Sequence, residues 1–117
     1  MNIFRLLFGP PVPSVSAVEA QARLKARPTP VLLDVRQPEE YRQAHIAGAI
    51  LIPLNELGRR MGELPKGREI LCVCRSGSRS QSAARQLLKA GYPVVNVRGG
   101  LIGWQAANLP VKKGPGR

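Results

Sequence analysis

One cysteine in this sequence is followed by residues suited to holding an anion. Cys74 comes after an apolar run at residues 69–73 and before five small, polar or cationic residues. A loop of such residues curling around the sulfur would aim backbone N–H groups at it. A helix expected over residues 80–90 would add the positive end of its dipole. Both effects favour the thiolate over the thiol, so we predict a lowered pKa and a nucleophilic Cys74.

The residues after Cys74 carry the groups that would contact an anionic substrate. Arg75 and Arg79 bring charge, and we expect at least one of them to bind the substrate; the alternative for Arg79 is to anchor the loop through backbone carbonyls. Serine hydroxyls can bond sulfur or substrate oxygens, although turn formation explains them equally well. Gly77 meets a backbone requirement, either a positive φ or a close approach. The predicted substrate-binding residues are Arg75, Ser76, Gly77, Ser78, Arg79 and Ser80.

The second cysteine, Cys72, is interpreted as a core residue rather than a nucleophile. It lies inside the apolar run, where a free cysteine is most simply a small core residue. In a strand, Cys72 and Cys74 would lie on one face with their Cα atoms roughly 6–7 Å apart, a poor span for a disulfide. A resolving role for Cys72 is therefore the weaker alternative. A metal site made with His45 is weaker still, because two thiols and one distant imidazole fall short of a normal ligand set.

Two further polar residues are expected to support the site. Asp34 ends a short apolar run at residues 31–33, and we interpret it as the acceptor of N–H bonds from a neighbouring loop. Arg36 has two equally weighted readings, which are assistance in anion binding and an ion pair with Glu39 or Glu40. Trp104 is interpreted as a core anchor of the last helix.

Short apolar runs alternate with amphipathic ones, which predicts an α/β domain with a mainly parallel sheet. In such sheets ligands bind at the carboxyl ends of the strands, which is where Cys74 is placed. Strands are expected at residues 31–34, 50–52, 69–73 and 94–97, and helices at residues 17–26, from residue 38, at 54–61, at 80–90 and around residue 104. Val18 and Ala22 are expected to form part of the buried stripe of the first helix.

The amino-acid composition limits the number of domains, the kinds of partner and the cellular compartment that we expect for this protein. A chain of 117 residues with 44% hydrophobic residues can build one domain. Eighteen Lys and Arg residues against seven Asp and Glu residues give a net charge of +11, which favours anionic partners. The basic residues are scattered and aromatic residues are scarce, so we expect no nucleic-acid partner. Two cysteines do not form a disulfide framework, and reduced thiols predict a cytoplasmic protein. No run approaches the ~20 apolar residues of a membrane span, and the apolar N-terminus is expected to pack on its own domain.

Several short motifs follow one another in a fixed order along residues 14–108. They are Asp34-Val35-Arg36, Pro38-Glu39-Glu40-Tyr41, His45-Ile46-Ala47-Gly48-Ala49, Ile52-Pro53, the loop Cys74-Arg75-Ser76-Gly77-Ser78-Arg79-Ser80, and Gly99-Gly100 with Trp104. Taken singly each motif is weak, but together and in this order they are specific, and they resemble the rhodanese family. Residues 1–13 are then an N-terminal extension and residues 109–117 a basic tail, expected to be frayed.

The resemblance implies a single domain with a five-stranded, mostly parallel sheet flanked by helices. It implies a sulfurtransferase in which Cys74 takes a sulfur from thiosulfate or a persulfide donor, holds it as a persulfide and passes it to cyanide or a thiol. No metal or organic cofactor is expected, and His45 becomes structural. The expected partners are a small anionic sulfur donor and a thiol acceptor, with a sulfur-relay protein as one form of acceptor, and the protein is expected to be a monomer.

Three other functions stay open at this point. Related phosphatases and arsenate reductases have an active-site loop one residue longer, closed by an arginine, whereas Ser80 occupies that position here and Arg79 comes one residue early. A smaller ring of N–H groups suits one sulfur atom better than a tetrahedral oxyanion. A non-catalytic binding or regulatory module of the same family often lacks the cysteine, which this chain retains. A nucleic-acid binder, suggested by the charge alone, would lose affinity steeply with salt.

Overall fold

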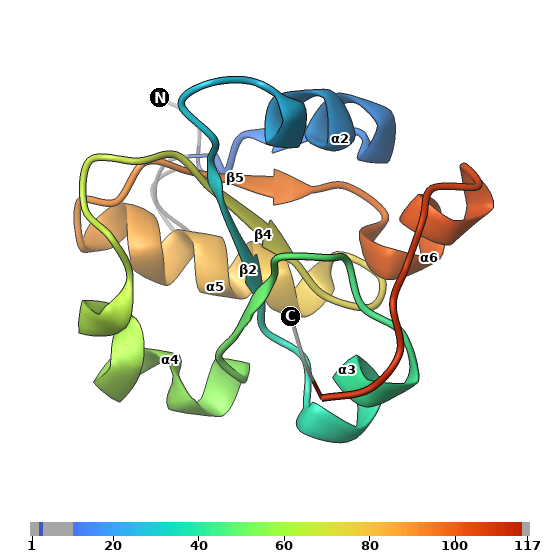
Figure 1. The fold of residues 1–117 in the computed structure, drawn as a ribbon. Helices are drawn as coiled ribbons and strands as arrows, with labels where there is room; N and C mark the ends of the chain where they lie inside the picture. The colour runs from blue at the N-terminus through green and yellow to red at the C-terminus, as the bar shows by residue number, and fades with distance from the viewer. Residues whose placement is uncertain (1–2, 4–10, 116–117) are drawn as a thin grey trace.

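Five short strands form one sheet in the order β1-β5-β4-β2-β3, and every neighbouring pair is parallel (Figure 1). The computed structural model describes residue 3 and residues 11–115. The strands are β1 (Ser14–Val15), β2 (Val31–Asp34), β3 (Ile50–Leu51), β4 (Ile70–Val73) and β5 (Val94–Val97). β4 is the central strand, and its carboxyl end leads directly into Cys74.

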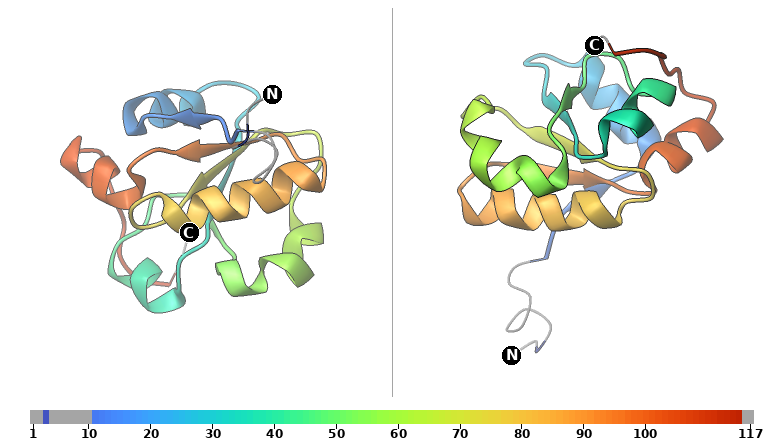
Figure 2. Two further views of the ribbon diagram at one scale, coloured as in Figure 1. Left: turned by 180° about the vertical axis from the view of Figure 1, so that it is seen from behind. Right: turned by 90° about the horizontal axis from the view of Figure 1, so that it is seen from below.

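Helices cover both faces of the sheet, which explains why the inner strands are apolar without alternation (Figures 1 and 2). The helices are α2 (Ala17–Lys25), α3 (Pro38–Gln43), α4 (Leu54–Arg60), α5 (Ser78–Lys89) and α6 (Gly100–Ala106), with a 3₁₀ turn η1 (Met61–Glu63) after α4. One core lies between the sheet and α4 and α5, and contains Leu57, Cys72 and Leu87. The other lies on the opposite face against α2, α3 and α6, and contains Tyr41 and Trp104.

The predicted elements are found with small changes at their ends. Ser16 caps α2 by accepting a bond from the Glu19 N–H at 3.1 Å, and Pro38 opens α3. The sheet is parallel throughout rather than mostly so. The fifth strand is β1, two residues long, which the sequence pattern did not separate from the start of α2. Val18 is 61% exposed and Ala22 is also exposed, so the assignment of both to the buried stripe of α2 was wrong. Ala17 and Ala20 form that stripe.

The described part of the C-terminal segment, residues 109–115, packs on the domain, contrary to the expected fraying. His45 and Lys112 exchange backbone hydrogen bonds of 2.9 and 2.7 Å. The Gly114 N–H donates to the Arg42 carbonyl at 2.9 Å, so the segment crosses from α6 to α3 (Figure 1). The prediction for the apolar N-terminus falls almost wholly on residues 1–2 and 4–10, which lie outside the described residues. Within the described part of the chain, no helix combines the length and the apolar character that a membrane span requires.

Candidate active site

The sulfur of Cys74 lies in a cradle of hydrogen-bond donors. The Gly77 N–H donates to Sγ at 3.0 Å, and the Ser80 hydroxyl lies 3.3 Å from it. Gly77 and Ser80 are themselves buried, whereas Arg75, Ser76 and Ser78 are exposed. The predicted loop therefore divides into a part that surrounds the sulfur and a part that faces solvent.

Helix α6 explains why the loop turns its N–H groups inward. The Leu101 N–H donates to the Cys74 carbonyl at 2.8 Å, and the Ile102 N–H donates to the Arg75 carbonyl at 3.0 Å. The carbonyl and the N–H of one trans peptide point in opposite directions. Because α6 holds the Arg75 carbonyl, the N–H of Ser76 is turned to the other side, toward the sulfur.

Burial and hydrogen bonding act on the pKa of Cys74 in opposite directions. Burial raises this pKa, but the Ser80 hydroxyl and the N–H groups of Ser80, Gly77 and Ser76 stabilise the thiolate and outweigh it. The pKa of Cys74 is therefore lowered, as the sequence predicted. The largest contributions that lower it are hydrogen bonds from Ser80, Gly77 and Ser76.

The site lies at the start of a helix that begins earlier than expected. Gly77 precedes α5 with φ of 112°, a conformation that favours glycine, and α5 begins at Ser78 rather than Ser80. The sulfur thus sits where a capping side chain would accept the free N–H groups of the first turn. The positive end of the α5 dipole adds to the stabilisation of a thiolate there.

Arg79 is engaged by a carboxylate. Its guanidinium makes two hydrogen bonds to Glu40, at 2.7 and 2.8 Å, which tie α5 to α3. The alternative of bonds to loop carbonyls was wrong, because Glu40 is the partner, while substrate contact by Arg79 stays a prediction. Its guanidinium lowers the pKa of Glu40 from 4.5 to about 2.

Replacing Glu40 with glutamine is expected to destabilise the protein slightly and in a pH-dependent way. The two side chains are 29% and 36% exposed, so we expect a loss of about 0.5–1 kcal/mol at pH 7. A carboxylate whose pKa is lowered on folding adds stability above its unfolded pKa, and this is lost as pH falls from 4.5 toward 2. The stabilities of wild type and Glu40→Gln, measured by urea unfolding, should converge over that range.

A matched control for this prediction is Glu19→Gln, which removes an ion pair with Arg23 on α2 instead. Should the difference between wild type and Glu40→Gln stay constant down to pH 2, the ion pair with Arg79 would not be its cause.

Asp34 and Arg36 form a buried ion pair beside the site, with side chains 1% and 3% exposed. The Arg36 backbone N–H donates to Asp34 Oδ1 at 3.0 Å, as the interpretation of Asp34 required. The Arg36 Nη2 donates to Asp34 Oδ2 at 2.8 Å and to the Ala44 carbonyl at 2.8 Å. The expected ion pair of Arg36 with Glu39 or Glu40 was wrong, because Asp34 is its partner. Arg36 Nη1 donates to the backbone carbonyl of Glu40 at 3.4 Å and not to its carboxylate.

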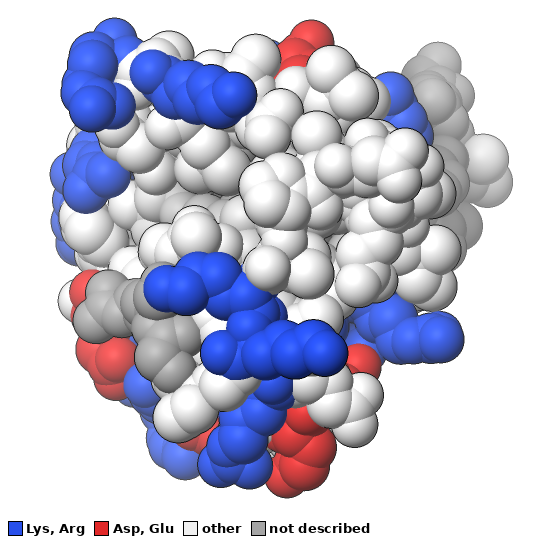
Figure 3. Space-filling model, turned by 45° about the vertical axis from the view of Figure 1, so that its right-hand side comes forward, with Lys and Arg blue, Asp and Glu red and all other residues white. Residues whose placement is uncertain are grey.

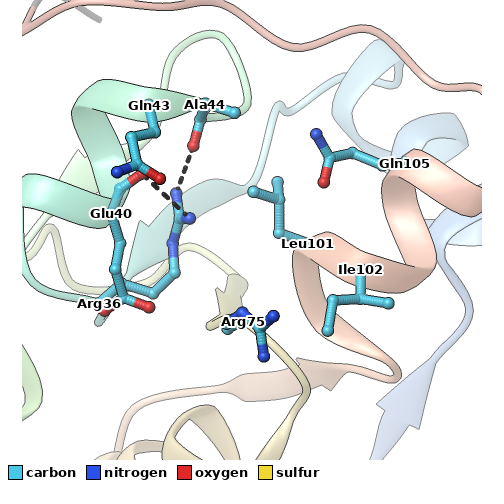
Figure 4. A pocket seen from close by; sticks show the side chains of 8 residues that line it. All are labelled: Arg36, Glu40, Gln43, Ala44, Arg75, Leu101, Ile102 and Gln105. Carbon is cyan, nitrogen blue, oxygen red and sulfur yellow. Dashed lines mark hydrogen bonds between the residues drawn. The ribbon is translucent and has the colours of Figure 1, made fainter.

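An open pocket of about 340 Å³ lies next to the cysteine loop (Figure 4). The end of α3 forms one wall, α6 forms the opposite wall with Leu101 and Ile102, and Arg75 projects from the loop between them. Among the described residues no acidic side chain forms an ion pair with Arg75, while Glu40 and Arg36 in the same pocket are both paired. The pocket therefore presents one uncompensated positive charge. Its lining residues are Arg36, Glu40, Gln43, Ala44, Arg75, Leu101, Ile102 and Gln105.

The other candidates from the sequence lie in the core. Cys72 is fully buried, and burial raises the pKa of its thiol, which makes it a poor nucleophile. His45 is buried and its ring stacks on Tyr41 with centroids 3.8 Å apart. Trp104 is 2% exposed, and its Nε1–H donates to the Pro110 carbonyl at 2.8 Å. Within the described part of the chain, no group of three or more His, Cys, Asp and Glu side chains could hold a metal ion.

Sequence reasoning missed one buried polar residue of the site. Asn96 in β5 is 7% exposed and contacts both Ser80 and Gly77. It is aligned with Cys72 in the neighbouring strand, so both side chains point to the α5 face of the sheet. A polar residue inside an apolar strand was the available signal, because a buried amide needs a partner.

Comparison with known proteins places this arrangement in a family. Residues 16–107 match the family model of the rhodanese-like domain. A sulfurtransferase of Allochromatium vinosum is 42% identical over 82 residues, covering 69% of this chain and 77% of that protein. A putative sulfur carrier protein of Bacillus subtilis is 39% identical over 94 residues, 80% of this chain but only 51% of its own length. The crystal structure of a thiosulfate sulfurtransferase from Pseudomonas aeruginosa superposes with a TM-score of 0.80 at 37% identity, covering 91% of this chain and 21% of that one.

Proposed function

Because this chain belongs to the family of rhodanese-like domains, we propose that it is a sulfurtransferase in which Cys74 carries the sulfur as a persulfide. The observation that carries the proposal is the cradle of N–H groups and the Ser80 hydroxyl around Sγ at the start of α5. Such a site stabilises a sulfur anion without a metal-ligand set. The names of the relatives support sulfur transfer in general, and the donor and acceptor below are part of the proposal.

In the first half of the reaction, the Cys74 thiolate attacks the outer sulfur of thiosulfate. A new S–S bond forms to Cys74, the S–S bond of the donor breaks, and sulfite leaves with the electron pair. The outer sulfur of the resulting persulfide is an anion. It is close to the N–H groups that previously faced the thiolate, so the cradle serves both states.

In the second half, a nucleophilic acceptor attacks the outer sulfur of the persulfide. The S–S bond to Cys74 breaks and the electron pair returns to Sγ, which regenerates the thiolate. Cyanide would leave as thiocyanate, and a thiol would leave as a persulfide. A similar protein named as a putative sulfur carrier makes a sulfur-relay protein a reasonable class of acceptor.

The charge distribution favours a small anionic donor. On the face drawn in Figure 3, Lys and Arg side chains form separate groups that outweigh the acidic ones. With a net charge of +11, the protein raises the local concentration of small anions. Arg75, unpaired by any described acidic side chain, is the residue that we propose contacts the donor anion beside the sulfur.

The proposed function is tested by intact-protein mass spectrometry. The reduced protein is incubated with thiosulfate, desalted, and then treated with cyanide. We expect a gain of one sulfur, about 32 Da, which cyanide removes with formation of thiocyanate. If neither thiosulfate nor a low-molecular-weight persulfide adds sulfur to the folded, reduced protein, the chain is not a sulfurtransferase and the binding-module alternative takes its place.

Replacing Arg75 with alanine is expected to weaken the capture of thiosulfate. Removing one charge that contacts the donor should raise KM for thiosulfate about tenfold, which corresponds to about 1.4 kcal/mol, with little change in kcat. The pKa of Cys74 should change little, because its largest lowering contributions are the hydrogen bonds of Ser80, Gly77 and Ser76. Steady-state kinetics with thiosulfate and cyanide measure both constants.

A matched control is Lys89→Ala, which removes the same charge at the far end of α5. Equal increases of KM in the two variants would mean that net charge, and not contact with Arg75, attracts the donor.

A further inference from the structure

The Ser80 hydroxyl lies close to three acceptors, although it has only one proton to donate. Its oxygen lies 2.5 Å from Asn96 Oδ1, 3.2 Å from the Gly77 carbonyl and 3.3 Å from Cys74 Sγ. A hydroxyl has one proton, whereas a carbonyl, an amide oxygen and a thiolate only accept. These three groups therefore compete for the same proton, and the amide oxygen of Asn96 is the nearest of them.

The Gly77 carbonyl fixes which end of the Asn96 amide faces Ser80. The Asn96 Nδ2 donates to this carbonyl at 3.3 Å, which leaves Oδ1 on the side of the hydroxyl. The opposite orientation would set two oxygens against each other and is disfavoured. Asn96 is also held by β5, where its backbone N–H donates to the Pro13 carbonyl at 2.8 Å. The acceptor beside Ser80 is thus built into the sheet.

We propose that Asn96 is a positioning residue, whose Oδ1 accepts the hydrogen bond of the Ser80 hydroxyl whenever Cys74 Sγ carries no negative charge. This inference rests on the proposed function. When Cys74 is a thiolate, the charge on Sγ attracts the hydrogen bond of the Ser80 hydroxyl in competition with Asn96 Oδ1. After sulfur capture Sγ is a neutral, two-bonded sulfur and the negative charge lies on the outer sulfur. Sγ is then a weak acceptor, and the hydroxyl proton turns to Asn96 Oδ1 without any movement of the backbone.

This competition limits how strongly the thiolate is stabilised. A thiolate that is held too tightly is a poorer nucleophile, because nucleophilicity falls with pKa. Asn96 moderates the effect of Ser80 on the resting thiolate and gives the hydroxyl an acceptor in the persulfide. Asn96 touches neither the sulfur nor a substrate, and it acts only through Ser80 and Gly77.

The test compares Asn96→Leu, Ser80→Ala and the double variant, all carrying Cys72→Ala so that one thiol is titrated. The pH dependence of alkylation by iodoacetamide reports the pKa of Cys74. We expect Asn96→Leu to move the midpoint down by about half a pH unit, because the Ser80 hydroxyl then donates its hydrogen bond more fully to the Cys74 thiolate. Ser80→Ala should move the midpoint up, because this hydrogen bond is lost. In the Ser80→Ala background, Asn96→Leu should have no further effect. Sulfur capture from thiosulfate above the midpoint should be about twofold slower in Asn96→Leu.

A second variant covers the case in which Asn96→Leu does not fold. Asn96→Asp has nearly the same shape, and its carboxylate competes more strongly for the proton, so the midpoint should rise. That rise should be smaller in the Ser80→Ala background, where the introduced carboxylate acts on the Cys74 thiolate only through its negative charge. The other groups coupled to the Cys74 charge include Cys72, replaced in every variant, and Arg79, which none of them alters.

The outcomes separate this inference from the proposed function. An unchanged or raised midpoint in Asn96→Leu, or an equal shift with and without the Ser80 hydroxyl, overturns the role of Asn96. Alkylation needs no sulfur donor, so that result stands whether or not the protein transfers sulfur. If wild type fails to capture sulfur from any donor while the midpoints shift as expected, the proposed function fails and the proton competition remains.

Discussion

Replacing Cys74 with alanine is expected to abolish sulfur capture. Cys74 is the residue whose sulfur lies within 3.0 Å of the Gly77 N–H and 3.3 Å of the Ser80 hydroxyl. No other group in the cradle can form a persulfide, so the rate of thiocyanate formation should fall by at least about a thousandfold. Mass spectrometry after incubation with thiosulfate should show wild type with one added sulfur and Cys74→Ala with none.

The matched control is Cys72→Ala, which lies in β4 two residues before Cys74 and belongs to the same core cluster. Burial raises the pKa of Cys72, so its thiol should neither take sulfur nor close a disulfide on Cys74. We expect Cys72→Ala to keep activity within a few-fold of wild type, with a loss of stability of about 1 kcal/mol from the small cavity. If the sulfur adduct is retained in Cys74→Ala, or lost in Cys72→Ala, our mechanism places the transferred sulfur on the wrong thiol.

The sequence was sufficient to predict where the nucleophile would be. A buried strand is recognisable from its apolar run, and Cys74 follows such a run without a gap, so its place at the carboxyl end of β4 depends only on local pattern. The lowered pKa followed from the same local features, which are small residues after the cysteine and a helix start. The residues in contact, Cys74 and Ser80, are only six positions apart in the chain.

The partners of the cradle could not be predicted in the same way, because they come from distant parts of the chain. Arg79 meets Glu40 across 39 positions, and Ser80 meets Asn96 across 16. A charged side chain carries no sequence signal for which distant carboxylate it will meet. β1 was missed for another reason, since a strand of two residues is too short to show alternation.

The largest structural effect that we expect comes from replacing Gly100 with alanine. Gly100 has φ of 58°, and a Cβ built there would lie 2.5 Å from the Cys74 carbonyl oxygen and 2.6 Å from that of Arg75. Both contacts are with backbone of the cysteine loop, so no side chain can move aside. The loop would have to shift away from α6 and give up the bonds from Leu101 and Ile102 that orient it. We expect a loss of about 2–4 kcal/mol in stability and at least about a hundredfold lower rate of sulfur capture.

The control for backbone strain is Gly99→Ala. Gly99 also has a positive φ, 81°, but a Cβ there would only reach Gly103 Cα at an ordinary 3.5 Å and would not touch the loop. Alkylation of Cys74 and sulfur capture, measured where near-ultraviolet circular dichroism shows native protein, should be close to wild type in Gly99→Ala and strongly reduced in Gly100→Ala. Equal losses in both variants would attribute the effect to the left-handed backbone alone. A loss confined to Gly100→Ala would show that the packing of α6 on two loop carbonyls keeps the N–H groups aimed at the sulfur, because Gly100 itself donates nothing to Cys74.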